Sequence, residues 1–357
     1  MPRTWSVTAR RVLTLIVILA MLCTAGLAMS GCSEDKSGDR EDIGTVTSET
    51  DTELTIIDQA GREVTVKKDT QSIALCYRVV IRFLLNLDQG DKITGIGKTE
   101  EFLEELQPSL ADCVDVGKGV ADIEALAELE PDLFIHKASD TETLEAVSKI
   151  GIPSIGIEVE TPEDMLTALD ILGKVLGVSD RAEELADYYK AAVDKSVAAA
   201  SGIDDADRKT AIVMGSSIGK VADGSMLQGE MLEKAGAINC AADLEASELW
   251  PTAGTEQIFA WNPDYIFITS SASYTAKDIY KESAWSELKA VKAGHVYMMP
   301  ARFDSWEFPG IVSSLGIEYM QSVIYPELVS ESQLESDVSA FYELAYRRTF
   351  TREELGY

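Results

Sequence analysis

Aromatic and basic side chains follow two short apolar runs in the first half of the chain. Residues 73–75 (Ile-Ala-Leu) and 95–97 (Gly-Ile-Gly) are typical of buried strands; Tyr77 and Arg78 come just after the first, and Lys98 follows the second. In open α/β sheets, ligands bind beyond the carboxyl ends of the strands. A tyrosine ring offers rigid contact area, and arginine and lysine form charge-assisted hydrogen bonds with anionic groups. These residues indicate a site that binds a ligand.

Signatures of catalysis are missing from the sequence. There is no phosphate-binding P-loop, no HExxH and no CxxC motif, and no nucleophile stands with a histidine and a carboxylate in the spacing of a known family. The 2 histidines, His136 and His295, are far apart. We therefore expect a protein that is not an enzyme, holds no metal in a cage of its own and needs no cofactor.

Two segments of the chain repeat one another and predict the fold. In each, a glutamate (Glu124 or Glu256) opens an apolar helical turn, a Pro-Asp pair stands seven residues later, and an apolar strand follows. The duplication predicts an α/β fold with two similar lobes, each built on a central parallel sheet. Two such lobes leave a ligand cleft between them.

Between the repeats, residues 179–202 predict one long helix, bounded by Ser179-Asp180 and Gly202. A helix of that length spans roughly 30 Å and would act as a stiff backbone between the lobes, although a surface helix gives the same pattern. We therefore place an N-terminal lobe at 53–178 and a C-terminal lobe at 203–357. The second lobe includes an amphipathic C-terminal helix from residue 332.

The N-terminus predicts export. Three arginines precede an apolar run over residues 12–29, and Ser30-Gly31-Cys32 follows, as in a signal peptide cleaved after residue 31. A cysteine at this position resembles a bacterial lipobox, which makes Cys32 the lipidation site. An uncleaved membrane anchor is the alternative. Either reading places the chain outside the cytoplasmic membrane, anchored to it.

Residues 32–52 are rich in Ser, Asp, Glu, Gly and Thr and predict a disordered tether. The whole chain has a formal net charge of −30, which argues against nucleic acid as a partner. General solubility accounts for this charge equally well. Among the remaining cysteines, Cys76 and Cys113 fall at strand-like positions, where either a disulfide or two free buried thiols are possible.

The order of motifs resembles the class III, helical-backbone, substrate-binding proteins of ABC importers. It comprises the lipobox, the polar tether, the run 56–66, the two Glu-to-Pro-Asp units, the long helix, and the late segments 285–297, 303–306 and 325–327. The resemblance covers residues 53 to about 354. It implies a monomer that captures a small molecule and passes it to a permease dimer driven by an ATPase.

The resemblance also implies roles for individual residues. Glu124 and Glu256 match the glutamates with which the cobalamin-binding member docks on its permease; a plain first-turn acidic residue is the alternative. Lys118 and Trp250 match aromatic positions of that member's pocket, and the lysine argues against a close copy of it. The late loop that matches the pocket contributes Arg302, Asp304 and Trp306.

The predicted ligand follows from charge. Arg78, Lys98, Lys118 and Arg302 would gather at the cleft of an otherwise acidic protein and attract an anionic metal chelate, with a ferric siderophore favoured. Haem, with Tyr77 or His136 as axial ligand, and cobalamin are alternatives within the same fold. A bare oxyanion such as molybdate or tungstate, bound by Ser216-Ser217 or Ser270-Ser271, is the runner-up.

Overall fold

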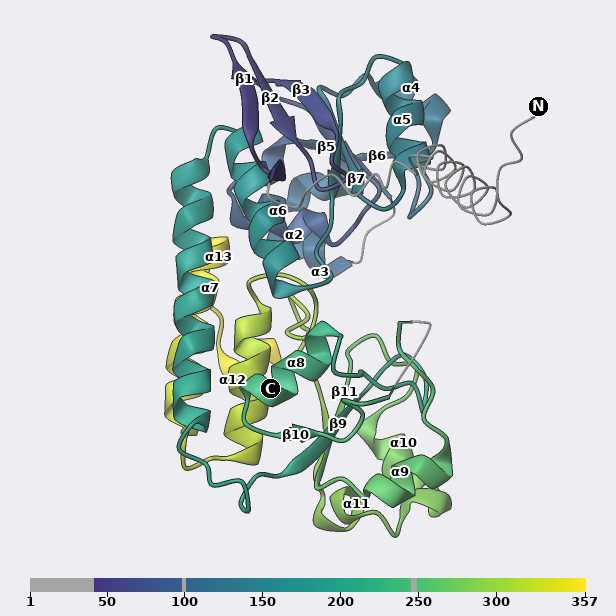
Figure 1. Ribbon diagram of the computed structural model, residues 1–357, viewed down its shortest axis with the longest axis vertical. Helices are drawn as coiled ribbons and strands as arrows, with labels where there is room; N and C mark the ends of the chain where they lie inside the picture. Colours follow the sequence, from purple (N-terminus) through teal and green to yellow (C-terminus); the bar gives the residue numbers. More distant parts are fainter. Residues whose placement is uncertain (1–41, 98–100, 245–248) are drawn as a thin grey trace, which may run out of the picture. The chain divides into compact units, whose positions relative to one another are not determined.

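Two parallel β-sheets organise residues Asp42–Tyr357 of the computed structural model, which describes residues 42–97, 101–244 and 249–357 (Figure 1). The predicted signal peptide 1–31, the lipidation site Cys32 and the candidate Lys98 lie outside the described residues. Within the described ranges, no helix has the length and apolar character needed to cross a membrane.

The first sheet has the strand order β6-β5-β4-β7-β8 and defines the first lobe. Strands β4, β7 and β8 are almost fully buried, as expected for a parallel sheet covered by helices. The strands are β4 (Ile73–Leu75), β5 (Ile93–Ile96), β6 (Val114–Asp115), β7 (Leu133–Lys137) and β8 (Ser154–Ile157), and the helices that connect them are α2 (Val80–Asn86), α3 (Glu101–Leu106), α4 (Ile123–Leu129) and α5 (Thr141–Lys149).

The second sheet has the order β10-β9-β11-β12 and defines the second lobe. Its four strands match β5-β4-β7-β8 of the first lobe, position for position, so the predicted α/β fold with two similar lobes is confirmed. The elements are β9 (Thr210–Met214), α8 (Leu227–Lys234), β10 (Ile238–Asn239), α9 (Thr255–Trp261), β11 (Tyr265–Ile268), α10 (Ala276–Lys281), α11 (Lys289–Ala293) and β12 (Val296–Met298).

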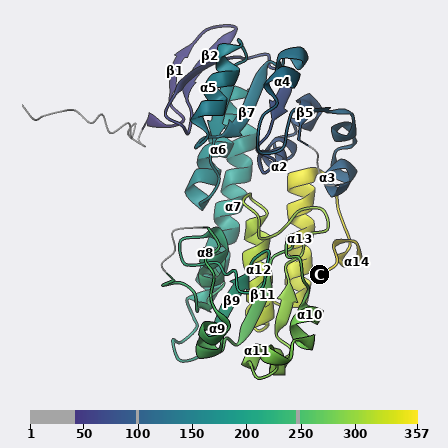
Figure 2. The ribbon, with the colours of Figure 1, turned by 90° about the vertical axis from the view of Figure 1, so that its right-hand side faces the viewer.

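The predicted long helix is α7 (Ser179–Ala200), with 22 residues. One face, including Leu185, Tyr189 and Val193, is buried. This helix packs against α6 (Pro162–Val175) of the first lobe and against α8 and α12 (Ser313–Ile324) of the second (Figure 2). It therefore contacts both lobes along its length, which suits a rigid connection.

The C-terminal helix α13 (Glu331–Tyr346) is amphipathic, as predicted, and α14 (Arg352–Leu355) follows it. The last turn of α13 reaches the first lobe, because Asn86 donates a hydrogen bond to the carbonyl of Ala345 (3.2 Å). It also contacts the long helix α7, because Arg181 donates a hydrogen bond to the carbonyl of Leu344 (2.5 Å). The C-terminal helix therefore belongs to the junction of the lobes as well as to the second lobe.

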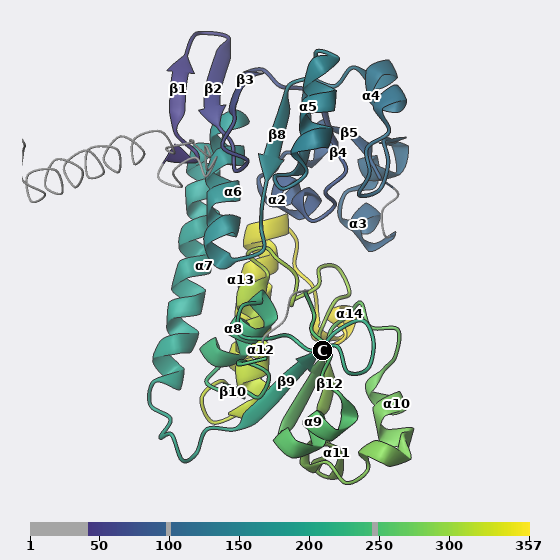
Figure 3. The ribbon, with the colours of Figure 1, turned by 45° about the vertical axis from the view of Figure 1, so that its right-hand side comes forward.

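An antiparallel sheet precedes the parallel sheet of the first lobe and corrects one prediction. It consists of β1 (Val46–Glu49), β2 (Glu53–Ile57) and β3 (Glu63–Lys67), beside α6 (Figure 3). The expected disordered tether 32–52 is therefore wrong from residue 46 onward. Three of the four β1 side chains are exposed, so the strand is held by backbone pairing with β2, which its polar composition does not reveal.

Candidate functional site

A pocket of about 280 Å³ draws its walls from both lobes. Tyr77 follows β4, Glu160 follows β8 and Thr269 follows β11, so the pocket lies at the carboxyl ends of the parallel strands, where this kind of sheet places ligands. The lining residues are Tyr77, Val79, Glu160, Ser225, Met226, Leu227, Gln228, Leu249, Trp250, Thr269, Ser271, Glu307, Phe308 and Pro309.

The first-lobe wall combines a phenol with carboxylates. Lys137 Nζ lies 2.8 Å from a carboxylate oxygen of Glu160, 3.8 Å from one of Glu158, and 5.8 Å from the ring centre of Tyr77. Burial raises the pKa of Tyr77 well above its usual value, and the charges of Glu160 and Glu158 add to the effect. The phenol is therefore protonated at neutral pH, and its hydrogen bond with Glu158 contributes to the raised pKa.

Trp250 forms the aromatic wall of the second lobe in a strained conformation. Its φ of +60° is in the left-handed region, which is unfavourable for a bulky residue. A methyl group on Gly215, just after β9, would lie 2.6 Å from Cε3 of the indole, so only glycine allows the ring to approach this backbone. Strain of this kind is typical of binding sites.

Glu307 is a fully buried carboxyl in the pocket wall. Its Oε1 accepts hydrogen bonds from the backbone N–H and the hydroxyl of Ser270, both at 2.6 Å, and the Ser305 hydroxyl lies 3.0 Å from that of Ser270. Its Oε2 has no hydrogen-bond partner among the described atoms. Burial raises the pKa of Glu307, and the hydrogen bonds from Ser270 only partly oppose this.

The structure brings two of the predicted ligand-contacting residues to the pocket, namely Tyr77 and Trp250. Of the predicted basic cluster, the three described members are not part of its lining. Arg78 is partly buried outside the lining, Lys118 is exposed on the loop before α4, and Arg302 pairs with Glu105 at 3.0 Å. The ion pair with Glu105 therefore holds Arg302 away from the pocket wall.

Asp304 and Trp306 were predicted to contact ligand, but the structure does not place them in the pocket wall. Both side chains are only 1% exposed. Asp304 forms a buried ion pair with Arg82 and accepts a hydrogen bond from Tyr346 (2.5 Å), and the indole N–H of Trp306 donates to the hydroxyl of Tyr342 (3.1 Å). Partners from α2 and α13 hold both residues in the core, behind the pocket.

Sequence reasoning missed the carboxyls. Glu160 follows β8, so the rule that located Tyr77 would also have found it. Glu307, Phe308 and Pro309 immediately follow Trp306, so the late loop does reach the pocket, but one to three residues further along than predicted.

The serines and histidines predicted for other ligands occupy different environments. Ser271 lines the pocket, whereas the Ser270 hydroxyl is bound to Glu307. His136 is 2% exposed and its Nε2 lies 2.9 Å from a carboxylate oxygen of Asp140, so it is not a pocket residue. No group of three or more His, Cys, Asp or Glu side chains able to hold a metal ion occurs in the described parts of the chain.

Residues 215–219 (Gly-Ser-Ser-Ile-Gly) have the GxSxG spacing of a hydrolase nucleophile. That motif requires a sharp turn from a strand into a helix. Here β9 ends at Met214, an exposed turn follows, and Lys220 forms a β-bridge with Thr252. Ser217, at the nucleophile position of the motif, therefore does not lie in the strand-to-helix turn that a nucleophile elbow requires.

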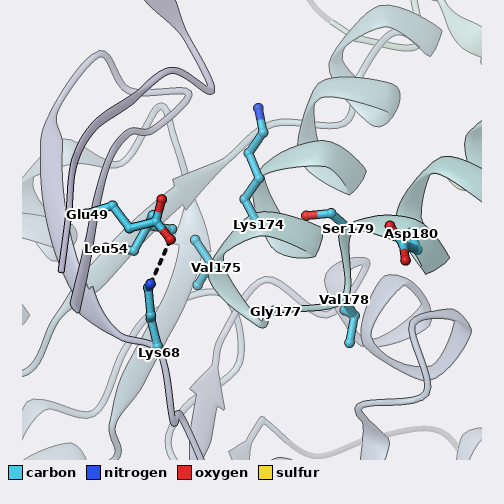
Figure 4. Close-up of a pocket in the computed structure, with 9 residues that line it drawn as sticks. All are labelled: Glu49, Leu54, Lys68, Lys174, Val175, Gly177, Val178, Ser179 and Asp180. Carbon is cyan, nitrogen blue, oxygen red and sulfur yellow. Dashed lines mark ion pairs between the residues drawn. The ribbon is translucent and has the colours of Figure 1, made fainter. Parts of the chain in front are cut away.

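A larger pocket, of about 420 Å³, lies between the antiparallel sheet and the turn from α6 to α7 (Figure 4). The ion pair between Glu49 and Lys68 (2.6 Å) crosses one side of it. Its lining contains no aromatic residue, and it is not at the carboxyl ends of the parallel strands. By size alone this pocket would be the candidate ligand site. The smaller pocket is the better candidate, because it has aromatic walls and lies at the carboxyl ends of the strands.

Glu124 and Glu256 occupy equivalent, exposed positions in the first turns of α4 and α9. Both helices end at a residue in the left-handed conformation, Glu130 (φ +48°) and Asn262 (φ +44°), directly before the Pro-Asp pair. The structural equivalence of the two units agrees with the repeat seen in the sequence. Their role in docking stays a prediction.

Comparisons with known proteins agree with this architecture. The model of a family described as periplasmic binding protein matches residues 73–303. The uncharacterized ABC transporter substrate-binding lipoprotein YvrC of Bacillus subtilis (strain 168) is 25% identical to the chain, over 88% of this chain and 98% of YvrC. The petrobactin-binding protein YclQ of the same organism is 26% identical, over 57% of this chain and 64% of YclQ.

A solved structure shares the fold. The molybdate-binding protein MolA of Haemophilus influenzae, determined with molybdate bound, superposes with a TM-score of 0.74 and 19% identity, over 83% of this chain and 99% of MolA.

Proposed function

The chain belongs to the periplasmic binding protein family, and we propose that it captures an iron chelate of the siderophore type and delivers it to the permease of an ABC importer. Proteins of this family bind solutes for transport, which confirms that the chain is not an enzyme. Such proteins act together with a permease and an ATPase. We further propose that lipid on Cys32 anchors the chain to the outer face of the membrane.

The pocket at the strand ends carries this proposal. Rings of Tyr77, Trp250 and Phe308 surround it, and aromatic walls with a few polar groups suit a compact organic chelate. The petrobactin-binding relative YclQ supports an iron chelate. A bare oxyanion fits less well, because the charged residues in the described lining, Glu160 and Glu307, are acidic and would repel it. Molybdate is kept as the comparison ligand because MolA shares the fold.

A thermal-shift panel tests the proposed function. Residues 33–357 would be purified without lipid and heated with ferric siderophores, haem, cobalamin, cobinamide, molybdate or tungstate. Because a ligand stabilises the folded state in proportion to the logarithm of its concentration over Kd, a saturating ferric chelate should raise Tm by several degrees. A rise with molybdate alone, or with haem alone, would refute the iron-chelate proposal.

The docking proposal needs a transport measurement. We expect the double variant Glu124→Lys, Glu256→Lys to reduce uptake by about tenfold or more while ligand binding changes less than about twofold, because paired charges set orientation and association rate at an interface. Glu128→Lys with Glu282→Lys, at other exposed positions of the two lobes, gives the same change in net charge. Equal uptake by both double variants would exclude docking through Glu124 and Glu256.

A further inference from the structure

We propose that the pocket selects a chelate carrying an organic cation, such as an alkylammonium group, and that Glu307 and Glu160 receive this cation. This inference rests on the proposed function and specifies the charge of the chelate. It reverses the expectation from the sequence, in which four basic residues would attract an anionic chelate.

The charge of the pocket wall is the first support. Both charged side chains in the described lining are carboxyls, and no lysine or arginine is part of it. Lys137, beside Glu160, is shared with Glu158, so two carboxyls face one ammonium group at the first-lobe wall. Arg82 forms the buried ion pair with Asp304, and its charge also acts on Glu307, where it lowers the pKa that burial raises. These contacts leave an excess of acidic groups around the pocket.

The unmet hydrogen-bonding capacity of Glu307 is the second support. The residue is 0% exposed, and Ser270 satisfies only its Oε1. A buried carboxyl oxygen without a partner is costly, so a ligand N–H that reached Oε2 would recover a substantial part of that cost. A cationic N–H donor would also favour the ionised form of this carboxyl and make the hydrogen bond charge-assisted.

The aromatic rings are the third support. Lys137 lies 5.8 Å from the ring centre of Tyr77, and the guanidinium carbon of Arg82 lies 5.2 Å from that of Phe308. Cations are thus already accommodated against two rings of this wall, and Trp250 adds the ring type that binds cations best. Carboxyls and aromatic faces together form the recognition chemistry of an organic cation.

Two matched chelates test the inference. Ferrioxamine B carries a free ammonium group, and its N-acetylated derivative has the same ferric trihydroxamate centre without that charge. We expect calorimetric titration to show ferrioxamine B binding at least about tenfold more tightly, as a charge-assisted hydrogen bond predicts. Equal affinities, or binding of an anionic ferric chelate alone, would overturn the inference but leave the iron-chelate function standing. Failure of every ferric chelate to bind would overturn both.

Variants assign the preference to the carboxyls. Glu307→Gln keeps an oxygen for Ser270 and should reduce the ratio of the two affinities to about one, mainly by weakening ferrioxamine B. Glu160→Gln, at the partly exposed wall, should reduce the ratio by a smaller factor. If Glu307→Gln does not fold, the ratio for Glu160→Gln tests whether the carboxyls cause the preference. Glu318→Gln is the matched control, because this carboxyl is also buried but lies outside the pocket. An unchanged ratio in both pocket variants would refute the assignment.

Discussion

Asp132 in the first lobe and Asp264 in the second make the same hydrogen bonds at the start of a neighbouring central strand. Asp132 accepts from the backbone N–H and the hydroxyl of Ser72 (3.2 and 3.1 Å), and its own N–H donates back to that hydroxyl (2.9 Å). Asp264 repeats the pattern with Thr210 (3.1, 2.9 and 3.1 Å). Because backbone groups inside a protein need hydrogen-bond partners, the same arrangement, here called the aspartate clamp, serves both lobes.

The pocket walls show no such equivalence. The first lobe contributes Tyr77, Val79 and Glu160, whereas the second supplies the remaining eleven lining residues, including Trp250 and the segment from Glu307 to Pro309. The strand starts and helix ends are fixed by backbone hydrogen bonding, which is the same in both lobes. The loops at the carboxyl ends carry the lining residues, and these differ between the two lobes.

The largest effect should come from the second-lobe wall. Trp250→Ala is expected to weaken ligand binding about thirtyfold, since truncating an aromatic anchor of a binding site removes about 2 kcal/mol of binding free energy. Tyr77→Phe, which removes only the phenol oxygen in the first lobe, should cost threefold or less. Titration of both variants with the same ferric chelate measures the difference.

The reverse order of these two effects would show that the first lobe dominates binding. Trp250→Gly serves as a backbone control, because glycine relieves the unfavourable φ without restoring the ring. It should bind as weakly as Trp250→Ala while melting at an equal or higher temperature. Tight binding by either variant would refute the role of the indole.

The sequence predicted the strands and helices of the two lobes better than the residues of the pocket wall, because local patterns specify the former and long-range contacts the latter. The repeat of Glu, Pro-Asp and an apolar strand is local, so the Asp132 and Asp264 units were visible in the chain. Tyr77 was found because the strand-end rule is also local. The burial of Trp306 depends on Tyr342, on a helix that comes later in the chain, and no short-range pattern reveals that contact.

A similar limit explains the misplaced basic cluster. Arg302 was expected near the ligand, but its carboxylate partner, Glu105, lies in the other lobe. In a chain with twice as many acidic as basic residues, most cations find a carboxylate nearby, so their positions depend on tertiary pairing. Composition predicts the net charge but does not predict which charges remain at the pocket.

An intermediate effect should separate the two aspartate clamps. The hydrogen bond from Lys67 (2.9 Å), aided by those from Gln71 and Ser72, lowers the pKa of Asp132 to about 2. At Asp264, burial acts to raise the pKa, but hydrogen bonds from Thr210 and the charge of Lys289 outweigh it, so its pKa is also lowered. We expect Asp132→Asn to lower the free energy of unfolding by about 1–2 kcal/mol at pH 7, and Asp264→Asn by less.

The pH dependence gives the sign of this effect. Because the folded-state pKa of Asp132 is below its unfolded value, its stabilisation is complete above about pH 5 and is lost as the pH falls toward 2. Urea unfolding of Asp132→Asn and the parent chain should therefore converge between those pH values. A difference that persisted at pH 2 would show that packing, and not charge, makes the clamp.

The smallest effect concerns the thiols, which occur at different places in the two lobes. The sequence allowed a disulfide between Cys76 and Cys113, but the structure has both free: Cys76 donates to the carbonyl of Val116 (3.1 Å) and Cys113 to that of Ile93 (3.2 Å). Burial raises the pKa of the first thiol to about 12 and of the second to about 11, so little reactive thiolate exists at neutral pH.

We expect a reducing agent to shift Tm by less than about 1 °C. Breaking a disulfide across this loop would instead cost about 3 kcal/mol or more and lower Tm by several degrees. Mass spectrometry after alkylation of the unfolded chain should find both thiols modified without prior reduction; a pair that resists alkylation would mean that the first lobe is cross-linked, unlike the second, where Cys240 is the one cysteine within the described residues.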